Sequence, residues 1–335
     1  MRRQTSPWVA FSVVIFVCVG MSALLAIPGK AQSSSTQQPA ILSISFPDVS
    51  HGWAAGLNGT ILATTDGGSN WKHQTTDEDA RQPFTAVDFI DAVHGWLATA
   101  TGSILVTSDG GVNWKRQSQL PAAPLCLQFL DSSRGWVAGT NGTIAATSDG
   151  GANSSLFIPP PISDFFSIHF VDPSRGWVVG TGGTILATTD GGGNWNPQSS
   201  GTTVGLLGVY FISASNGWAV GQNGTILATT DGGTSWKPQF SGTQVVLHSV
   251  HFIDPNHGRV VGMGGTILET SDGGMSWKHQ PSGTTGNLYT LQFVDSNHGW
   301  TASPSPWAPG IWATTDGGAT WKPQLVADST DAPKN

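Results

Sequence analysis

Apolar and polar residues alternate in a short segment that recurs seven times along the chain and ends each time at a phenylalanine, as in Val250-His251-Phe252. A period of two predicts a β-strand with one buried face. A polar turn follows, and then a second strand-like segment that begins Gly-Trp in six copies. A third segment, Gly-Thr-Ile-Leu in most copies, leads into the phrase Asp-Gly-Gly. The fourth runs from a Trp through Lys-x-Gln, as at Trp236 to Gln239.

The spacing of the seven copies predicts the architecture. Successive Asp-Gly-Gly aspartates are 43, 40, 41, 41, 41 and 44 residues apart. A period of 40 to 45 residues with four strands per repeat is typical of a β-propeller blade. We therefore predict an all-β, seven-bladed β-propeller of four-stranded antiparallel blades. The aspartates are Asp66, Asp109, Asp149, Asp190, Asp231, Asp272 and Asp316.

The repeats also divide the chain into regions. We expect a signal peptide at 1–31, a linker at 32–40, the propeller at 41–325 and a disordered tail at 326–335. The first region has two arginines, a mostly apolar run and then small residues, which is typical of a secretory signal. Its apolar run is also long enough for an uncleaved anchor. Either alternative predicts export to the periplasm, the outside of the cell or the outer face of the cytoplasmic membrane.

Composition and charge exclude several classes of partner. Charged residues are 10% of the chain and the formal net charge is −7, which becomes −10 when the three positive charges of 1–31 are removed. A chain with this net negative charge is expected to bind nucleic acid and anionic lipid poorly. Cys126 is the single cysteine after residue 31, so no intramolecular disulfide and no cysteine metal site is expected. We predict no cofactor and no metal.

The Asp-Gly-Gly phrase itself has a structural interpretation. The aspartate can accept hydrogen bonds from amides of its own turn, and the glycines can adopt positive φ without strain. A Trp that opens the next strand can bury about 150–250 Å² between blades. The alternative is a calcium loop, but each copy carries one aspartate where calcium needs several oxygen ligands. We interpret the seven aspartates as scaffold.

The turn between the first and second strands carries a second repeated pair. Six copies place an aspartate three residues before His or Arg, and the fifth copy has the neutral pair Ser213 and Asn216. Replacement of both partners together favours a turn-bridging interaction over a catalytic or anion-binding role. The six pairs are Asp48/His51, Asp91/His94, Asp131/Arg134, Asp172/Arg175, Asp254/His257 and Asp295/His298.

The combined repeat resembles the Asp-box, or bacterial neuraminidase repeat, propellers, and within them the photosystem II stability and assembly factors. Three copies add the Ser-Gly-Thr linker of that family, as at Ser200-Gly201-Thr202. The resemblance implies a non-catalytic chaperone that holds a reaction-centre precursor through an arginine cluster. Here five arginines follow residue 31, and two of them occupy the turn position described above. We expect a monomer with a protein partner, a membrane protein complex being one candidate, and membrane contact only through an uncleaved N-terminal segment.

An enzyme of the sialidase or xyloglucanase kind is the alternative. A sialidase-like site needs three arginines and a Tyr beside a Glu, and the chain has two tyrosines and two glutamates outside such a motif. Other glycosidases need two carboxylates across a cleft. Outside the repeated positions Asp88 is the one aspartate within a core strand, and it has no clear partner. We predict a binding module, with a glycan-binding or glycan-hydrolysing propeller as the second hypothesis.

Positions where the copies differ are the candidate binding residues. The residue before the first-strand phenylalanine varies, and first strands surround the central channel of a propeller. This channel ring is a hypothetical recognition surface, and a set of solvated channel residues is the alternative. It consists of Ser45, Asp88, Gln128, His169, Tyr210, His251 and Gln292.

Two breaks in the repeat add further hypotheses. The seventh copy has a Pro-rich loop that presents Trp307, either as a contact residue or as drift in a terminal repeat. The third copy has Ser154 in place of the box Trp, and we expect Phe157 to fill the vacated space.

Overall fold

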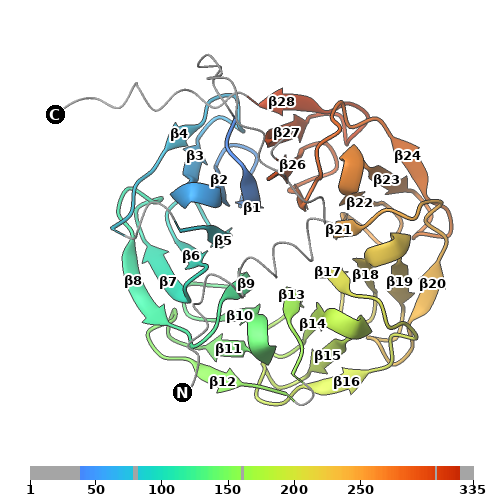
Figure 1. Cartoon of the computed structure of the whole chain (residues 1–335), viewed down its shortest axis with the longest axis horizontal. Coiled ribbons are helices and arrows are strands. Elements are labelled where there is room, and N and C mark those ends of the chain that lie inside the picture. The colour runs from blue at the N-terminus through green and yellow to red at the C-terminus, as the bar shows by residue number, and fades with distance from the viewer. Residues whose placement is uncertain (1–37, 78–81, 160–161, 306–307, 325–335) are drawn as a thin grey trace, which may run out of the picture. The chain divides into compact units, whose positions relative to one another are not determined.

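A computed structural model describes residues 38–77, 82–159, 162–305 and 308–324. It contains seven four-stranded antiparallel sheets arranged in a ring (Figure 1). The predicted all-β, seven-bladed propeller is therefore confirmed. The expected signal peptide, the disordered tail and Trp307 lie outside the described residues, as does most of the expected linker.

Each blade is built from four consecutive strands, with the first strand innermost in the ring (Figure 1). The strands of the first four blades are β1 (Ile41–Ser45), β2 (Gly52–Gly56), β3 (Ile61–Thr64), β4 (Lys72–His73); β5 (Phe84–Phe89), β6 (Gly95–Thr99), β7 (Ser103–Thr107), β8 (Lys115–Gln119); β9 (Pro124–Phe129), β10 (Gly135–Gly139), β11 (Ile144–Thr147), β12 (Ser155–Phe157); and β13 (Phe165–Phe170), β14 (Gly176–Gly180), β15 (Ile185–Thr188), β16 (Asn196–Gln198). Those of the last three are β17 (Leu206–Phe211), β18 (Gly217–Gly221), β19 (Ile226–Thr229), β20 (Lys237–Gln239); β21 (Leu247–Phe252), β22 (Gly258–Gly262), β23 (Ile267–Thr270), β24 (Lys278–Gln280); and β25 (Thr290–Phe293), β26 (Gly299–Ser303), β27 (Gly310–Thr314), β28 (Lys322–Gln324).

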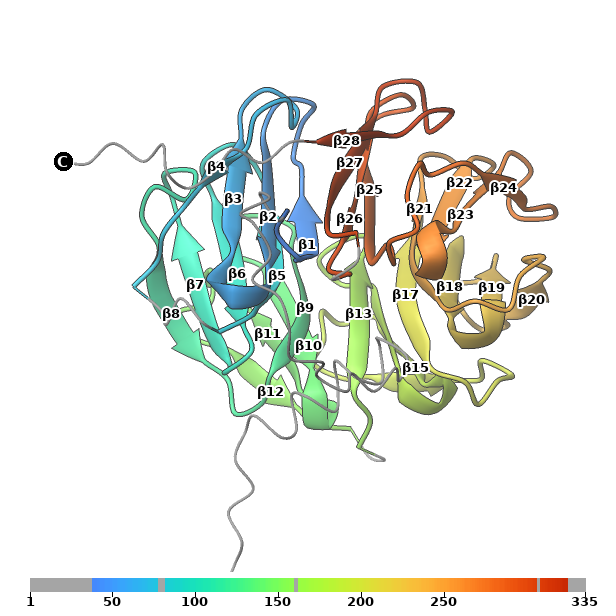
Figure 2. The same cartoon turned by 45° about the horizontal axis from the view of Figure 1, so that its top comes forward.

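The alternating strand directions give the propeller two different faces (Figure 2). The Asp-Gly-Gly turns and the turns between first and second strands share one face, which we call the box face. In blade one the two turns are joined there by a hydrogen bond of 2.8 Å from the Gly67 amide to the Ser50 carbonyl. The turns between second and third strands and the segments between blades form the opposite face, which we call the linker face.

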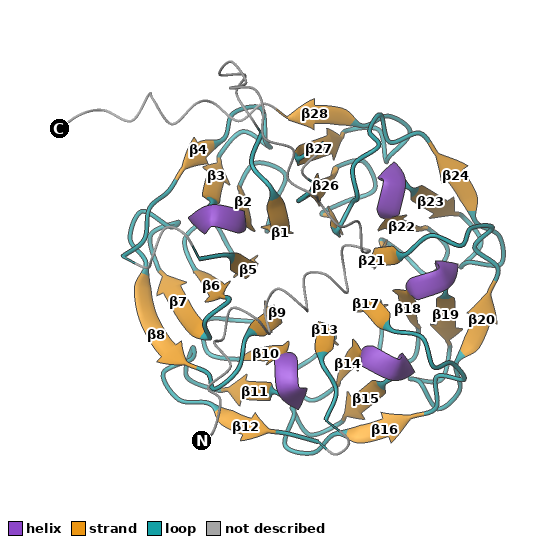
Figure 3. Ribbon diagram, in the orientation of Figure 1, coloured by secondary structure: helices purple, strands orange, loops and turns teal. Residues whose placement is uncertain are grey.

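The linker face carries the helical structure of the described residues. Five blades turn from their second to their third strand through a single 3-10 turn (Figure 3). None of the helices among the described residues is long and apolar enough to cross a membrane. The 3-10 turns are η1 (Leu57–Gly59), η2 (Thr140–Gly142), η3 (Thr181–Gly183), η4 (Gln222–Gly224) and η5 (Met263–Gly265).

The core lies at the joints between blades, where aromatic rings from two blades meet. At the first joint Trp53 of β2 stacks on Phe89 of β5 with ring centroids 3.5 Å apart, and the box residue Trp114 meets Phe89 edge-on at 5.7 Å. The Trp53 indole N–H also donates to the carbonyl of Gly110 at 3.0 Å. The same Trp-on-Phe stack recurs at most joints because the repeat places both rings in register.

The glycine of the Gly-Trp pair is required by this packing. A Cβ atom on Gly52 would lie 2.1 Å from the ring of Phe46, which covers that glycine from the adjacent strand. Any side chain at Gly52 would displace the ring from its stack on Trp300, whose centroid is 3.7 Å away. The constant Gly-Trp of the sequence therefore follows from close approach of an aromatic ring to backbone.

The last blade closes on the first through side chains, since both sheets consist of their own four strands. Gln292 Oε1 accepts from the Phe46 amide at 2.8 Å, and Gln292 Nε2 donates to the Phe46 carbonyl at 3.0 Å. The Trp300 indole donates to the Gly67 carbonyl at 2.9 Å. Ring closure thus uses the same contacts as the other joints.

Two joints depart from the pattern. Phe157 does not fill the space of the missing box Trp of blade three, because it packs into the cluster that blade three shares with blade four. Leu120, which follows β8, lies instead in the cluster around Phe129. Between blades six and seven Arg259 replaces the Trp: its guanidinium lies 4.7 Å from the Phe293 ring centroid and donates to Glu269 at 2.7 Å.

Candidate functional site: the central channel

The channel ring lies on the innermost strands, and several of its side chains reach to the next blade. Asp88 Oδ2 accepts from the Phe129 amide at 2.7 Å, and Gln128 Oε1 accepts from the Phe170 amide at 2.6 Å. Ser45 Oγ accepts from the Phe89 amide at 2.9 Å. With Gln292 at the closing joint, these four residues each connect their blade to the amide of the neighbouring blade's first-strand phenylalanine.

Asp88 is the one acidic member of the channel ring. Burial raises its pKa to about 6, although hydrogen bonds from the Phe129 amide and the Ser45 hydroxyl favour the ionised form. The Ser45 hydroxyl lies 3.4 Å from Asp88 Oδ1. The structure therefore brings Asp88 and Ser45 together.

Tyr210 lies between two histidines of the channel ring. The centroid of its ring is 4.5 Å from that of His169 and 4.5 Å from that of His251. Burial lowers the pKa of His169 to about 4 and that of His251 to about 3, so both are neutral at physiological pH. His169 Nδ1 lies 3.4 Å from the Phe211 amide. Among the described residues no group of three His, Cys, Asp or Glu side chains could hold a metal ion.

The Asp boxes have the turn geometry predicted for them. Asp66 Oδ1 accepts from the Asn70 amide and the Thr64 hydroxyl, each at 2.8 Å, and Asp66 Oδ2 accepts from the Asn70 side chain at 2.7 Å. Gly67 and Gly68 have φ of 68° and 94°, in the region that favours glycine. All seven aspartates accept bonds in this way. The side chain four residues on, Asn, Ser or Thr, lowers the pKa of Asp190, Asp231, Asp272 and Asp316 to about 2.

The repeated turn pairs are also in contact. His51 Nδ1 lies 2.9 Å from Asp48 Oδ2, and Arg134 Nη2 lies 2.7 Å from Asp131 Oδ2. The same carboxylates also accept hydrogen bonds from backbone amides of the turn; Asp131, for example, accepts from the Ser133 amide at 2.8 Å. These hydrogen bonds hold the pKa of Asp131 below its ordinary value. In blade five Ser213 Oγ accepts from the Asn216 amide at 3.0 Å. The predicted turn-bridging contact is confirmed.

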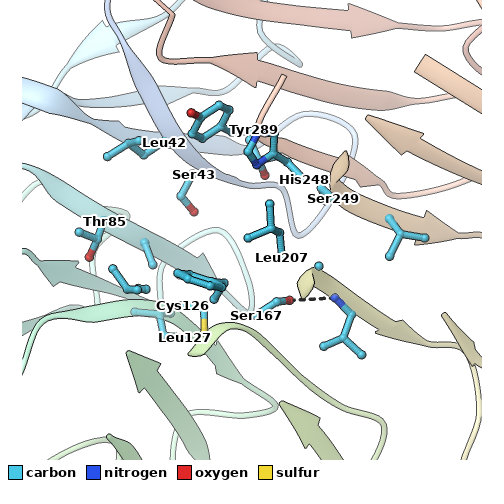
Figure 4. Close-up of a pocket in the computed structure, with 17 residues that line it drawn as sticks. Leu42, Ser43, Thr85, Cys126, Leu127, Ser167, Leu207, His248, Ser249 and Tyr289 are labelled. Carbon is cyan, nitrogen blue, oxygen red and sulfur yellow. Dashed lines mark hydrogen bonds between the residues drawn. The ribbon is translucent and has the colours of Figure 1, made fainter. Parts of the chain in front are cut away.

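A pocket at the linker-face end of the channel was not identified from the sequence. It is a cavity of about 170 Å³ lined mostly by the second, third and fourth positions of first strands, such as His248, and by Tyr289, which directly precedes β25 (Figure 4). Residues at the second position vary among the copies just as the channel ring does, from Leu42 and Thr85 to His248. That variation could have indicated the pocket from the sequence. A strand with strictly alternating side chains, however, would point this position away from the channel.

Fold and repeat together define the protein class: an Asp-box, seven-bladed propeller. The chain belongs to the family described as "Photosynthesis system II assembly factor YCF48", whose model matches residues 28–158, 158–237 and 239–285. The photosystem II assembly protein Ycf48 of Thermosynechococcus vestitus is 37% identical over 73 residues, which cover 20% of this chain and 21% of that protein. The match to this curated relative thus spans about a fifth of its length.

Solved structures show the same fold. A structure described as YCF48 bound to D1 peptide has a TM-score of 0.71 and 23% identity, covering 87% of this chain and 99% of that one. YCF48 from Cyanidioschyzon merolae has a TM-score of 0.70 and 22% identity over 84% of this chain and 97% of that one. A GH74 xyloglucanase from Xanthomonas campestris has a TM-score of 0.68 and 15% identity, with 86% of this chain and 55% of that one covered.

Proposed function

We propose that this protein is an exported, non-catalytic assembly factor that binds a protein segment of a membrane complex, photosystem II in a phototrophic host. The family match over most of the propeller carries the proposal. A structurally similar propeller is described as bound to a D1 peptide, which supports a protein ligand for this fold.

Most of the described carboxylates already bind other groups of the protein, which supports a non-catalytic role. The box and turn aspartates are held by their own turns, Asp88 binds the next blade, and Glu269 pairs with Arg259. Among the other described carboxylates, Asp164 accepts from the Asn141 amide at 2.9 Å and Asp77 lies exposed in a linker. A glycosidase needs two carboxyl groups on opposite sides of a substrate. The described acidic residues supply no such pair.

We place the partner on the linker face. The described parts of three segments that depart from the repeat belong to this face: 74–77 and 82–83 after blade one, 158–159 and 162–164 after blade three, and 304–305 and 308–309 in the second turn of blade seven. Ile162 and Phe240 also lie there, with exposed fractions of 71% and 87%. Irregular loops with exposed apolar side chains are a common basis of protein recognition on a regular scaffold.

The test is cross-linking of the full-length protein in membranes of its own host, followed by identification of the cross-linked peptides. We expect a subunit of an incompletely assembled membrane complex. We also expect the double variant Ile162→Ser/Phe240→Ser to lower its yield at least about fivefold, a loss of roughly 1 kcal/mol in binding. The matched control is Val112→Ser/Met275→Ser, which removes apolar residues of 73% and 84% exposure from the box face.

Equal yields from both variants would contradict the linker-face assignment, and absence of any membrane-complex subunit would contradict the function. Hydrolysis of xyloglucan or of a sialoside by the purified protein would favour the enzyme hypothesis instead. Export is tested separately, by N-terminal sequencing of the protein from the periplasmic and membrane fractions. Recovery of the protein in the cytoplasm alone would contradict it.

A further inference from the structure

The pocket at the linker-face end of the channel exists because the first strands bulge. In β21 Leu247 pairs with Gly262 and Ser249 pairs with Val261, so His248 is the extra residue of a β-bulge. A bulge puts two consecutive side chains on one side of a strand. His248 and Ser249 therefore both line the pocket.

His248 lines this pocket and has one hydrogen-bonding atom without a partner. Its side chain is 7% exposed, and its Nε2 atom is buried without a partner. The imidazole stacks on Tyr289 with ring centroids 4.1 Å apart and an interplanar angle of 23° (Figure 4). Most buried polar atoms in native proteins are hydrogen-bonded, so an unpaired nitrogen at a cavity indicates a ligand atom.

The rest of the lining describes the ligand. Apolar side chains including Leu42, Phe166 and Leu207 surround the cavity, and no Asp, Glu, Lys or Arg is among the described residues that line it. Burial lowers the pKa of His248 to about 4, so the imidazole is neutral at physiological pH. A charged ligand would lose its water without gaining a counterion.

Serine hydroxyl groups also line the cavity. Ser43 Oγ accepts from the Val87 amide at 3.2 Å, and Ser167 Oγ accepts from the Val209 amide at 3.1 Å (Figure 4). A serine hydroxyl that accepts a bond still has a proton to donate. The cavity volume of about 170 Å³ is close to that of an engineered cavity that holds one benzene ring.

We propose that this pocket binds one uncharged aromatic ring that carries a hydroxyl or N–H group, with His248 Nε2 as its hydrogen-bond partner. The ring belongs either to a free small phenol or indole or to a tyrosine or tryptophan side chain of a bound peptide. This site is separate from the channel ring and does not depend on the proposed assembly function.

The test is titration of the full chain with p-cresol, followed by saturation-transfer NMR. We expect saturable one-to-one binding, toluene weaker by about fivefold for its missing hydroxyl, and p-toluate weaker by at least about tenfold for its charge. A capped Gly-Gly-Tyr-Gly-Gly peptide separates the two sources. Binding of the peptide assigns the pocket to a peptide side chain, and binding of p-cresol alone assigns it to a small molecule.

The variant His248→Phe keeps a ring against Tyr289 and removes the nitrogen, so p-cresol should bind it no better than toluene. His279→Phe, at an exposed histidine on β24 of the same blade, is the matched control and should bind as the unchanged protein does. If His248→Phe does not fold, Tyr289→Leu removes the stacking partner instead and should weaken p-cresol about fivefold. Unchanged binding in the folded variant, or no saturable binding of either probe to the unchanged protein, would overturn the proposal.

Discussion

The two faces of the propeller are built from the same repeat but differ in regularity. On the box face every blade repeats the Asp box, in which the aspartate accepts from the amide four residues on at 2.8 to 2.9 Å, and six blades repeat the Asp–His or Asp–Arg turn pair. On the linker face one blade replaces its 3-10 turn with a Pro-containing loop, and two linkers break the repeat. Hydrogen bonds within the turns therefore constrain the box face, whereas the linker face accommodates segments of different length and sequence.

The largest expected effect comes from a joint residue near the box face. Trp53 is 2% exposed, stacks on Phe89 and donates to Gly110. Trp53→Ala should lower the free energy of unfolding by about 3–5 kcal/mol, measured by urea denaturation. Val112→Ser, on an exposed position of the next box, is the control. A loss below about 1 kcal/mol for Trp53→Ala would show that the joints do not carry the stability.

The joint between blades six and seven can be compared with the regular joints, because it has an ion pair where they have a Trp and a small side chain. Arg259 and Glu269 stand where other blades have Trp and mostly Ala, and the Arg259 side chain is 8% exposed. Replacing a buried ion pair by packed apolar groups is often stabilising. Arg259→Trp/Glu269→Ala should raise the free energy of unfolding by about 1–3 kcal/mol, whereas Arg259→Ala alone should lower it. Loss of stability in the double variant would indicate a specific need for the ion pair.

Asp88 of the channel ring should make the free energy of unfolding depend on pH. Its folded pKa of about 6 exceeds the ordinary value of 3.8, so the folded state binds more protons and stability falls as pH rises from about 4 to 6. Asp88→Asn should remove this dependence and raise the free energy of unfolding at pH 8 by roughly 2 kcal/mol. Asp77→Asn, at an exposed position, is the control. The same slope in both variants would contradict the assignment of the titration to Asp88.

The box aspartates have lowered pKa values, so their effect on stability changes with pH in the opposite direction to that of Asp88. The pKa of Asp231 is lowered from 3.8 to about 2 by hydrogen bonds from Ser235 and Thr229. Its stabilising effect is therefore complete above about pH 4 and is lost as pH falls towards 2. Asp231→Asn should therefore flatten the acid-unfolding curve between those values and lower the free energy of unfolding by a constant amount between pH 5 and 8. A change confined to neutral pH would contradict the turn assignment.

The smallest effect on stability is expected on the linker face. Ile162 and Phe240 are largely exposed, so Ile162→Ser/Phe240→Ser should change the free energy of unfolding by less than about 0.5 kcal/mol. Thermal denaturation beside Val112→Ser/Met275→Ser measures this. A loss above about 1 kcal/mol would show that the linker face is also part of the scaffold, and the contrast between the faces would then fail.

The sequence was sufficient for the fold because the repeat carries local information seven times. The Asp-Gly-Gly turn needs its own carboxylate and two glycines at positive φ, as Asp66, Gly67 and Gly68 have. The turn pairs, such as Asp48 and His51, are three residues apart, so they too could be recognised along the chain. Local hydrogen bonding and turn geometry determine both features without knowledge of the ring.

The candidate sites depended on contacts that only the ring creates. Channel-ring residues such as Asp88 and Gln128 bind an amide some 40 residues further along the chain, which no single repeat reveals. The contribution of the channel ring to partner recognition stays a prediction. The pocket was missed because a β-bulge turns His248 towards the channel, and a pattern of period two cannot register an extra residue.

By itself the sequence determined the blade count, the order of strands and the geometry of the Asp-box and paired turns, because each follows from the repeat and from interactions within it. Tertiary structure alone decided how blade seven meets blade one and where Phe157 packs. It also decided that Arg259 takes the place of a Trp against Phe293, and that a neutral pocket forms around His248. These features join residues of different blades, and only closure of the ring brings them within hydrogen-bonding and packing distance.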